Sequence, residues 1–394
     1  MTIIDSKTAL RQAQAALMKR DAQGALAILR AAEARHPRDA EIKLQIALAL
    51  RLAGDLPAAI DALDGVLALE PYHFPALLSK GALLERVAGP RAACTVYRHA
   101  VEIAPPPERL PPGLQAPLAR AREVLDENAR ALEAFLRERV HEVRSAFGTE
   151  RLTRFDEALG VFAGTKRIYQ QQPLLLHYPQ LPAIPFYDEA LFPWLPQLEA
   201  ATETIRDEMH AALETAPADF APYIAYPPGV PVNQWGELNH SRRWSSFFLW
   251  RDGERQDGAC AQCPRTAALL ESLPMAHQAG YAPTAMFSVL EAHTHIPPHT
   301  GSSNIRLLVH LPLVLPGPAR FRVGNEVREW RMGKAWVFDD TIEHEAWNDA
   351  DELRVILIFD VWNPCLSEAE RELITAMMAA RREYYGFIEE TAGQ

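Results

Sequence analysis

Apolar and polar positions follow two different periods along this chain of 394 residues. Up to about residue 147, apolar residues recur three to four positions apart, which is typical of helices. From about residue 165 this spacing fades, proline becomes frequent, and short runs of Val, Ile, Leu, Phe and Trp alternate with turn residues. The pattern therefore predicts a helical N-terminal part followed by a β-rich part.

The helical part carries an internal repeat with a step of 34 residues. The step relates a small residue, an aliphatic or aromatic residue and a proline: Ala25, Ala59 and Ala93; Leu29, Leu63 and Tyr97; Pro37, Pro71 and Pro105. This pattern resembles the tetratricopeptide repeat, whose units are helix pairs. The resemblance implies three such repeats over residues 1–105, each second helix ending before a proline. A generic alanine-rich helical bundle is the alternative.

A proline-rich stretch then precedes a second helical segment, residues 106–165. Apolar residues at helical spacing predict one long helix over residues 114–147: Leu118, Val124, Leu125, Leu132, Leu136 and Val140. Terminal units of a repeat stack must shield their apolar face from water. We therefore expect this helix to cap the stack, or to serve as a linker.

Residues 166–394 contain six runs with the length and composition of strands. They are residues 245–251, 285–290, 305–314, 320–323, 335–338 and 354–361. Many short strands separated by turns predict an all-β sandwich or jelly roll. A closing helix is expected after Pro364, where Ser367 and Glu370 form a capping box. The expected fold is multidomain: an all-α solenoid followed by a jelly-roll β domain.

Composition and charge argue against several classes of function. A net charge of −11 disfavours nucleic-acid binding, which needs a basic surface. The first residues lack the features of a secretory signal, and no apolar stretch reaches the roughly 18–20 residues of a membrane span. We therefore expect a cytoplasmic protein without a membrane partner. Cys260 and Cys263 form an isolated C-x-x-C and are expected to be surface-loop thiols.

Two histidines in separate strand-like runs, His299 and His344, are the candidate centre of chemistry. Imidazole binds iron, zinc, copper and nickel, so the pair alone does not select a metal. Two protein ligands leave open positions for a bidentate co-substrate and dioxygen, whereas structural zinc requires four. Ten residues after the second histidine, Arg354 opens a strongly apolar run, where an inward guanidinium requires an anion.

Several motifs around these residues resemble the aspartyl/asparaginyl β-hydroxylase family, which consists of Fe(II)- and 2-oxoglutarate-dependent dioxygenases on a double-stranded β-helix. They are Ser288-Val-Leu, His299-Thr-Gly-Ser-Ser-Asn-Ile-Arg306, His310-Leu-Pro-Leu and Phe338-Asp-Asp-Thr-Ile-Glu-His344. The similarity covers residues 178–365. Some members also carry N-terminal tetratricopeptide repeats, in agreement with the first part of this chain.

The resemblance implies a role for each matched residue. His299 and His344 match the two iron ligands. Arg354 matches the arginine that binds the distal carboxylate of 2-oxoglutarate, a contact that suits the planar guanidinium. Ser288 would donate a hydrogen bond to the same carboxylate, and His310 would contact the end of 2-oxoglutarate that chelates iron.

Gly301 agrees with an absence that characterises this family, because related oxygenases carry Asp or Glu at the same position. Water would fill that coordination position. Asp339 and Asp340 are not expected to replace the missing carboxylate but to hold the turn before the second histidine by accepting backbone N–H bonds. Glu345 falls on the opposite strand face from that histidine, and Trp347 is expected in the core.

Two alternatives stay open for the co-substrate residues. Arg354 could form an ion pair with Asp349 or Asp351 instead of binding a ligand. Ser288 could simply be solvated on its strand.

One position departs from the family pattern. Members that act on acidic side chains have a further arginine two residues before the equivalent of His310, and this chain has Leu308 there. This departure leaves recognition of a substrate carboxylate open. Arg242, Arg243 or Arg306 could supply the missing cation.

The resemblance thus implies an Fe(II)- and 2-oxoglutarate-dependent dioxygenase that β-hydroxylates Asp or Asn residues of a peptide or protein. The repeats would engage such a polypeptide, because solenoids present concave binding surfaces. Hydroxylation of a free amino acid or small metabolite, halogenation, and a non-catalytic scaffold are the alternatives.

Overall fold

The computed structural model describes residues 5–148 and 152–385. Three segments lie outside the described residues: 1–4, 149–151 and 386–394. The expected first repeat includes the first of them, the expected helical segment the second, and the expected β domain the third. The chain divides into two compact units, Met1–Lys166 and Arg167–Gln394, and each is described by itself.

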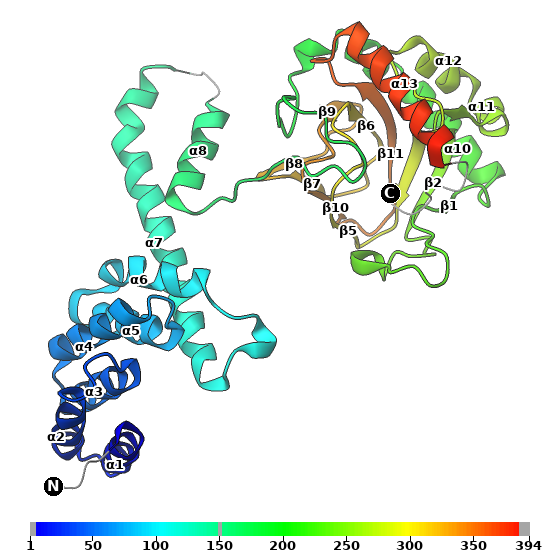
Figure 1. The fold of residues 1–394 in the computed structure, drawn as a ribbon. Helices are drawn as coiled ribbons and strands as arrows, with labels where there is room; N and C mark the ends of the chain where they lie inside the picture. Colours follow the sequence, from blue (N-terminus) through cyan, green and yellow to red (C-terminus); the bar gives the residue numbers. More distant parts are fainter. Residues whose placement is uncertain (1–4, 149–151, 386–394) are drawn as a thin grey trace. The chain divides into compact units, whose positions relative to one another are not determined.

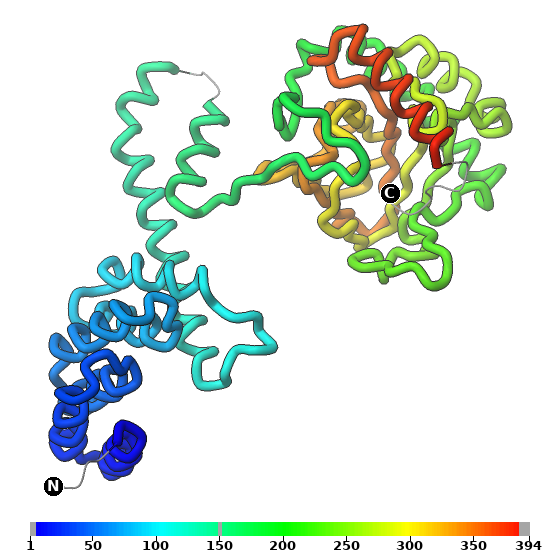
Figure 2. Tube along the Cα trace, in the orientation of Figure 1, coloured from blue at the N-terminus to red at the C-terminus, as the bar shows by residue number. Residues whose placement is uncertain are grey.

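The first unit begins with three consecutive helix pairs in the described residues (Figure 1, Figure 2). The helices are α1 (Ser6–Met18), α2 (Ala22–Glu33), α3 (Ala40–Ala53), α4 (Leu56–Leu69), α5 (Phe74–Ala88) and α6 (Pro90–Glu102), followed by the short 3-10 helix η1 (Pro107–Arg109). Ala25, Ala59 and Ala93 occupy matching places in the second helix of each pair and are fully buried. The predicted tetratricopeptide-like helix pairs are confirmed.

The next helix, α7 (Pro112–Ser145), is the long helix that the apolar spacing predicts. Its first half buries Leu118 and Val124 against α5 and α6, so it covers the apolar end of the repeat stack. Its second half contacts α8 (Thr153–Ala163), a helix that the pattern does not predict. Neither α7 nor any other helix in the described part of the chain combines the length and apolarity needed to cross a membrane.

The second unit contains two antiparallel sheets (Figure 1). The strands are β1 (Ala221–Pro222), β2 (Trp244–Arg251), β3 (Glu254–Arg255), β4 (Ala285–Leu290), β5 (Thr294–His299), β6 (Arg306–Val314), β7 (Ala319–Val323), β8 (Glu326–Glu329), β9 (Trp336–Phe338), β10 (His344–Asn348) and β11 (Arg354–Trp362). One sheet has the order β1-β2-β4-β11-β6-β9 with β3 beside β2, and the other has the order β5-β10-β7-β8.

From β4 to β11 the chain passes back and forth between the sheets. Strands β4, β6, β9 and β11 belong to the larger sheet, and β5, β7, β8 and β10 belong to the smaller one. This is the strand order of a double-stranded β-helix, so the expected β fold is confirmed. The strands β1, β3 and β8 are not predicted, because they are short and, for β8, largely polar.

Short helices cover the outer face of the larger sheet, and the sequence pattern does not predict them. They are α9 (Leu195–Ala200), α10 (Thr202–Thr215), α11 (Asp257–Gln262) and α12 (Pro264–Ser272), with the 3-10 helices η2 (Glu189–Leu191) and η3 (Asn233–Trp235) elsewhere in the unit. Most span fewer residues than a helical period needs to become visible. The closing helix α13 (Glu368–Tyr385) is confirmed with its capping box, in which Ser367 and Glu370 exchange backbone-to-side-chain hydrogen bonds.

Strict alternation along β11 divides its side chains between two cores. Residues 355, 357, 359 and 361 pack toward helices α9 to α12. Arg354, Ile356, Ile358 and Asp360 face the space between the sheets. A pocket lies in that space, and the helices pack behind the sheet that forms one of its walls.

The expectation that Cys260 and Cys263 are surface thiols is wrong. Both are buried in the core between helices α11 and α12 and the larger sheet. Burial raises the pKa of the Cys263 thiol to about 12, so it is an unreactive, apolar packing group. A free cysteine behaves as a small apolar residue, and its spacing to a second cysteine does not reveal this.

Candidate active site

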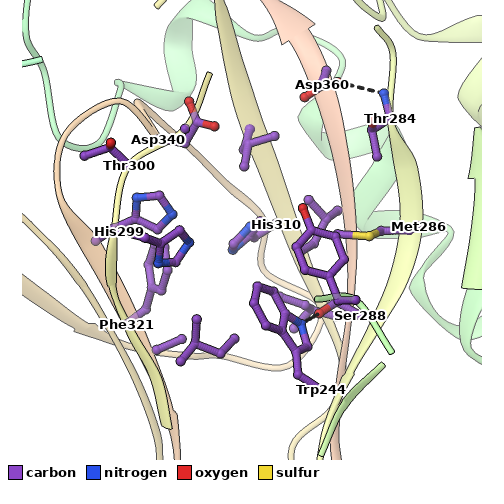
Figure 3. Close-up of a pocket in the computed structure, with 18 of the residues that line it drawn as sticks. Trp244, Thr284, Met286, Ser288, His299, Thr300, His310, Phe321, Asp340 and Asp360 are labelled. Atoms are coloured by element: carbon purple, nitrogen blue, oxygen red, sulfur yellow. Dashed lines mark hydrogen bonds between the residues drawn. The ribbon is translucent and has the colours of Figure 1, made fainter. Parts of the chain in front are cut away.

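A pocket lies between the two sheets, and Figure 3 shows side chains that line it. Strands β4, β6 and β11 form one wall, and β5, β7 and β10 form the other. The five site residues expected from the sequence all line this pocket: Ser288, His299, His310, His344 and Arg354. The fold therefore brings together side chains from five strands.

His299 and His344 are direct cross-strand partners on β5 and β10, and their ring centroids are 4.0 Å apart. Ile296 on β5 also faces the pocket, so strict alternation would turn His299 away from it. A register shift between His344 and Ala346 absorbs one residue of β5. This bulge directs both rings into the same pocket.

Backbone carbonyls fix the tautomer of both rings. Nδ1 of His299 lies 2.8 Å from the carbonyl oxygen of Pro297, and Nδ1 of His344 lies 3.1 Å from that of Ile342. Only a protonated nitrogen can donate to a carbonyl, so each Nε2 keeps a free lone pair. Burial lowers the pKa of His299 to about 4 and that of His344 well below its ordinary value. Both rings are therefore neutral and able to bind a metal.

Asp340 fills the space beside Gly301. A Cβ atom built on Gly301 would overlap the carboxyl group of Asp340. The amide of Gly301 also donates to the backbone carbonyl of Asp340 at 2.7 Å. The position that lacks an acidic residue in the sequence thus has a carboxyl group beside it, supplied by the loop between β9 and β10.

The two consecutive aspartates have different roles. Asp339 holds the turn as expected, because its Oδ1 accepts from the backbone amide of Thr341 at 3.0 Å. Asp340 does not: it lines the pocket, it is 6% exposed, and its Oδ1 has no hydrogen-bond partner. Burial raises the pKa of Asp340 to about 8, and the nearby Arg306 opposes that shift. The expectation of a turn-holding role is therefore wrong for Asp340.

Arg354 is the largest fully buried side chain of the described residues, at 1% exposed. Its Nε and Nη1 atoms have no hydrogen-bond partner, and its guanidinium lies 5.2 Å from the centre of the Trp330 ring. Asp349 binds Arg320 and Asp351 binds His293, so the alternative in which either pairs with Arg354 is wrong. Desolvation alone lowers the pKa of Arg354 to about 9.

His310 and Ser288 lie on strands that flank β11. Both ring nitrogens of His310 are buried without a hydrogen-bond partner, and burial, with Arg354 adding to it, lowers its pKa well below the ordinary value. Ser288 is 1% exposed, so the alternative of a solvated strand serine is wrong. Its Oγ accepts a hydrogen bond from Nε1 of Trp244 at 3.0 Å.

Leu308 lines the same pocket together with Arg306. Arg306 forms a 2.9 Å ion pair with the buried Asp360 and donates to the carbonyl of Tyr281 and the hydroxyl of Ser302. Arg306 is therefore engaged within the protein. Arg242 and Arg243, the other cations that could offset Leu308, are not among the pocket-lining residues.

The outer face of the smaller sheet carries the residues that flank the second histidine. Glu345 binds His295 and Arg322 there, in agreement with the expected opposite face. Trp347 stacks on His295 with ring centroids 5.0 Å apart and lies beneath Arg320. Trp347 is therefore a half-buried surface residue, and its expected place in the core is wrong.

The pocket residues that were not anticipated from the sequence include Tyr223, Trp244 and Trp330. Trp244 opens β2, and its position directly before the strand predicted over residues 245–251 is the one signal that could have found it. Trp330 lies in a polar segment between β8 and β9, where nothing in the pattern indicates burial.

Fold and site together define a double-stranded β-helix protein with a two-histidine pocket between its sheets. The family described as Aspartyl/Asparaginyl beta-hydroxylase matches residues 199–364. The aspartyl/asparaginyl beta-hydroxylase of Homo sapiens is 36% identical over 181 residues, which are 46% of this chain and 22% of that protein. The ornithine lipid ester-linked acyl 2-hydroxylase of Rhizobium tropici is 35% identical over 201 residues, which are 50% of this chain and 67% of that protein.

The chain belongs to the aspartyl/asparaginyl β-hydroxylase family and is thus a member of a family of hydroxylases. It spans 22% and 23% of the length of the human and mouse relatives, respectively. Among solved structures, the Yersinia enterocolitica type III secretion translocator chaperone SycD is similar with a TM-score of 0.28 and 14% identity, over 32% of this chain and 85% of that one.

Gly301→Ala is expected to lower the free energy of unfolding by about 1–3 kcal/mol, because the added methyl group overlaps the carboxyl group of Asp340. In the Asp340→Ala background the same change should cost much less. Denaturant unfolding of wild type, both single variants and the double variant measures this coupling. Equal costs in the two backgrounds would contradict the contact.

Proposed function

We propose that the protein is an Fe(II)- and 2-oxoglutarate-dependent dioxygenase that hydroxylates an aliphatic carbon of its substrate. The observation that carries this proposal is the guanidinium of Arg354, which is buried in the pocket and has no acidic partner among the described residues. A buried charge of this kind needs a counter-ion, and a dicarboxylate co-substrate would provide one.

The two histidines fit iron(II). Each presents a neutral Nε2 lone pair toward the pocket, and imidazole is a common ligand of non-haem iron. Among residues 5–148 and 152–385, no three His, Cys, Asp or Glu side chains gather as a metal site. His299 and His344 would therefore be the only side chains that hold the metal, and 2-oxoglutarate and water would complete its coordination.

The polar groups left without partners fit 2-oxoglutarate. Arg354 would bind its distal carboxylate through the free Nε and Nη1, and the hydroxyl of Ser288 would donate to the same group. His310, whose nitrogens are both unpaired, would contact the chelating end. A neutral imidazole can donate there from one nitrogen without adding charge.

When bound, iron and 2-oxoglutarate supply the oxidative chemistry, in which 2-oxoglutarate and dioxygen become succinate and CO2 and one oxygen atom enters a C–H bond of the substrate. The chain itself orients the reactants and keeps water out. Apolar side chains from both sheets line the pocket for this purpose: Ile296, Phe321, Ala346, Ile356 and Ile358.

For the substrate, we propose an Asp or Asn residue of a peptide or protein, hydroxylated at Cβ. The family supports this choice. The repeat unit supports a polypeptide partner, because stacked helix pairs present extended binding surfaces. A free amino acid or small metabolite is the rival substrate, and a non-catalytic scaffold is the rival role.

A second candidate substrate is an uncharged aliphatic chain, and the pocket wall around Leu308 favours it. Met286 and Ile358 line the pocket with Leu308, and the nearby Arg306 forms an ion pair with Asp360. Among the described residues that line the pocket, a substrate carboxylate would find no unpaired cation other than Arg354. The name of the Rhizobium tropici relative, an acyl 2-hydroxylase, supports the same class of substrate.

His299→Ala is expected to reduce iron-dependent succinate formation to the background rate, because the metal would keep a single protein ligand. The matched control is His295→Ala on the same strand, whose ring binds Glu345 on the outer face and should leave the rate unchanged. Purified full chain is assayed with Fe(II), 2-oxoglutarate and oxygen by NMR detection of succinate. No succinate from wild type, or full activity of His299→Ala, would refute the dioxygenase.

Arg354→Met is expected to raise the KM for 2-oxoglutarate by at least about 100-fold, because removing one partner of a buried charge pair costs roughly 3–5 kcal/mol. Without 2-oxoglutarate, however, the variant should be as stable as wild type or more stable, since it removes an unpaired buried charge. Succinate formation at varied 2-oxoglutarate concentrations measures the KM, and thermal unfolding without 2-oxoglutarate measures the stability. The contrasting variant is Arg306→Met. It removes the cation that pairs with the buried Asp360, so it should unfold at a lower temperature than wild type.

Leu308→Arg distinguishes the two substrate candidates. If the substrate is aliphatic, the variant should hydroxylate an acyl chain at least about 10-fold more slowly, because a cation replaces an apolar contact. It should also hydroxylate random heptapeptides with a central Asp faster than wild type does. Mass spectrometry for one added oxygen on these peptides and on ornithine lipid measures both, with Leu308→Met as the neutral control. A wild type that prefers the Asp peptides would exclude the aliphatic candidate.

A further inference from the structure

One hydrogen bond in the pocket joins a tryptophan to the serine beside Arg354. Nε1 of Trp244 on β2 donates to Oγ of Ser288 on β4 at 3.0 Å, and Figure 3 shows this contact at the pocket wall. Trp244 is 5% exposed and Ser288 is 1% exposed, so water does not compete for the bond. Ser288 lies opposite Ile356 in the strand register, and Arg354 precedes that residue by two positions, on the same face of β11.

The chemistry of the two groups fixes the direction of this bond. An indole N–H can only donate, so the hydroxyl oxygen of Ser288 must accept. The hydroxyl proton then has to point elsewhere, and the described residues offer Ser288 no acceptor for it. Trp244 therefore makes Ser288 a hydrogen-bond donor toward the pocket.

We propose that Trp244 is a positioning residue, which orients the Ser288 hydroxyl as a donor to the distal carboxylate of 2-oxoglutarate. This inference rests on the proposed function. Both Ser288 and Arg354 then present only hydrogen-bond donors, and no acceptors, to this carboxylate. A hydroxyl that is free to rotate would at times turn its oxygen lone pairs toward the carboxylate. The lone pairs and the negative carboxylate repel each other, so this orientation weakens binding.

Packing of Trp244 can be separated from its hydrogen bond. Its ring contacts Tyr223, Trp235 and His299, with centroid distances of 4.3, 5.8 and 6.4 Å. Phenylalanine keeps an aromatic ring in this cluster and removes the N–H. Trp336 provides a matched control, because it is a buried tryptophan whose Nε1 has no partner and which does not line the pocket.

The test is a double-mutant cycle on 2-oxoglutarate affinity. The ligand is titrated calorimetrically into anaerobic, Fe(II)-loaded full chain, so that binding is measured without turnover. Trp244→Phe and Ser288→Ala should each weaken binding by about 3- to 10-fold, the range expected for one hydrogen bond. The double variant should bind 2-oxoglutarate with the same affinity as Ser288→Ala alone. In turnover assays, the KM for 2-oxoglutarate should rise while kcat stays, and Trp336→Phe should change neither.

Several outcomes would overturn the inference. Unchanged affinity in Trp244→Phe would do so, as would an equal loss in the Ser288→Ala background, which would mean that the tryptophan acts by packing. If Trp244→Phe does not fold, the wild-type chain serves instead: the indole N–H resonance that Ser288→Ala displaces should also move on adding 2-oxoglutarate, and an unmoved signal refutes the proposal. A wild type that binds no 2-oxoglutarate refutes the proposed function itself.

Discussion

A guanidinium buried without a carboxylate is the constraint on which the rest of the site depends. Side chains alternate along β11, and residues 355–359, which follow Arg354, are apolar and buried on both faces of the strand. The strand is therefore buried on both faces, and Arg354 is buried with it. Such a charge costs free energy unless a ligand compensates it. On the two strands that flank β11, His310 has no hydrogen-bond partner among the described residues, and the partner of Ser288 is Trp244. In the proposed enzyme, these groups would recognise 2-oxoglutarate, and the chain without this ligand would be less stable for keeping them buried, as is common for binding sites.

The sequence predicts those features that follow from a regular period. The 34-residue step locates the helix pairs, and the apolar run after Arg354 locates the central strand and the inward arginine. Features that break the period are not predictable in this way. The bulge that turns His299 into the pocket contradicts simple alternation, and short helices such as α11 and α12 show too few turns for a pattern. Burial of Cys263 likewise depends on tertiary packing.

Gly301 shows why an absence in the sequence is hard to interpret. The linear pattern states only that an acidic side chain is missing two residues after the first histidine. In space, the carboxyl group of Asp340 lies where that side chain would begin, and it comes from a loop that is 39 residues away in the chain. Leu308 is a different case, because the sequence showed only that the expected arginine is missing and left recognition of a substrate carboxylate open. The structure adds that Arg306, the nearest substitute cation, is already engaged by Asp360.

His299 and His344 each donate from Nδ1 to a backbone carbonyl, and this has a consequence for the affinity of the proposed site for its metal. Two neutral imidazoles, each supported by a backbone carbonyl, contribute little charge and few bonds to a divalent ion. In the proposed enzyme, a chelating co-substrate would complete the coordination, so each component would raise the affinity for the other by the same factor. Metal content would then follow the concentration of 2-oxoglutarate. Iron would leave the protein when the co-substrate is scarce.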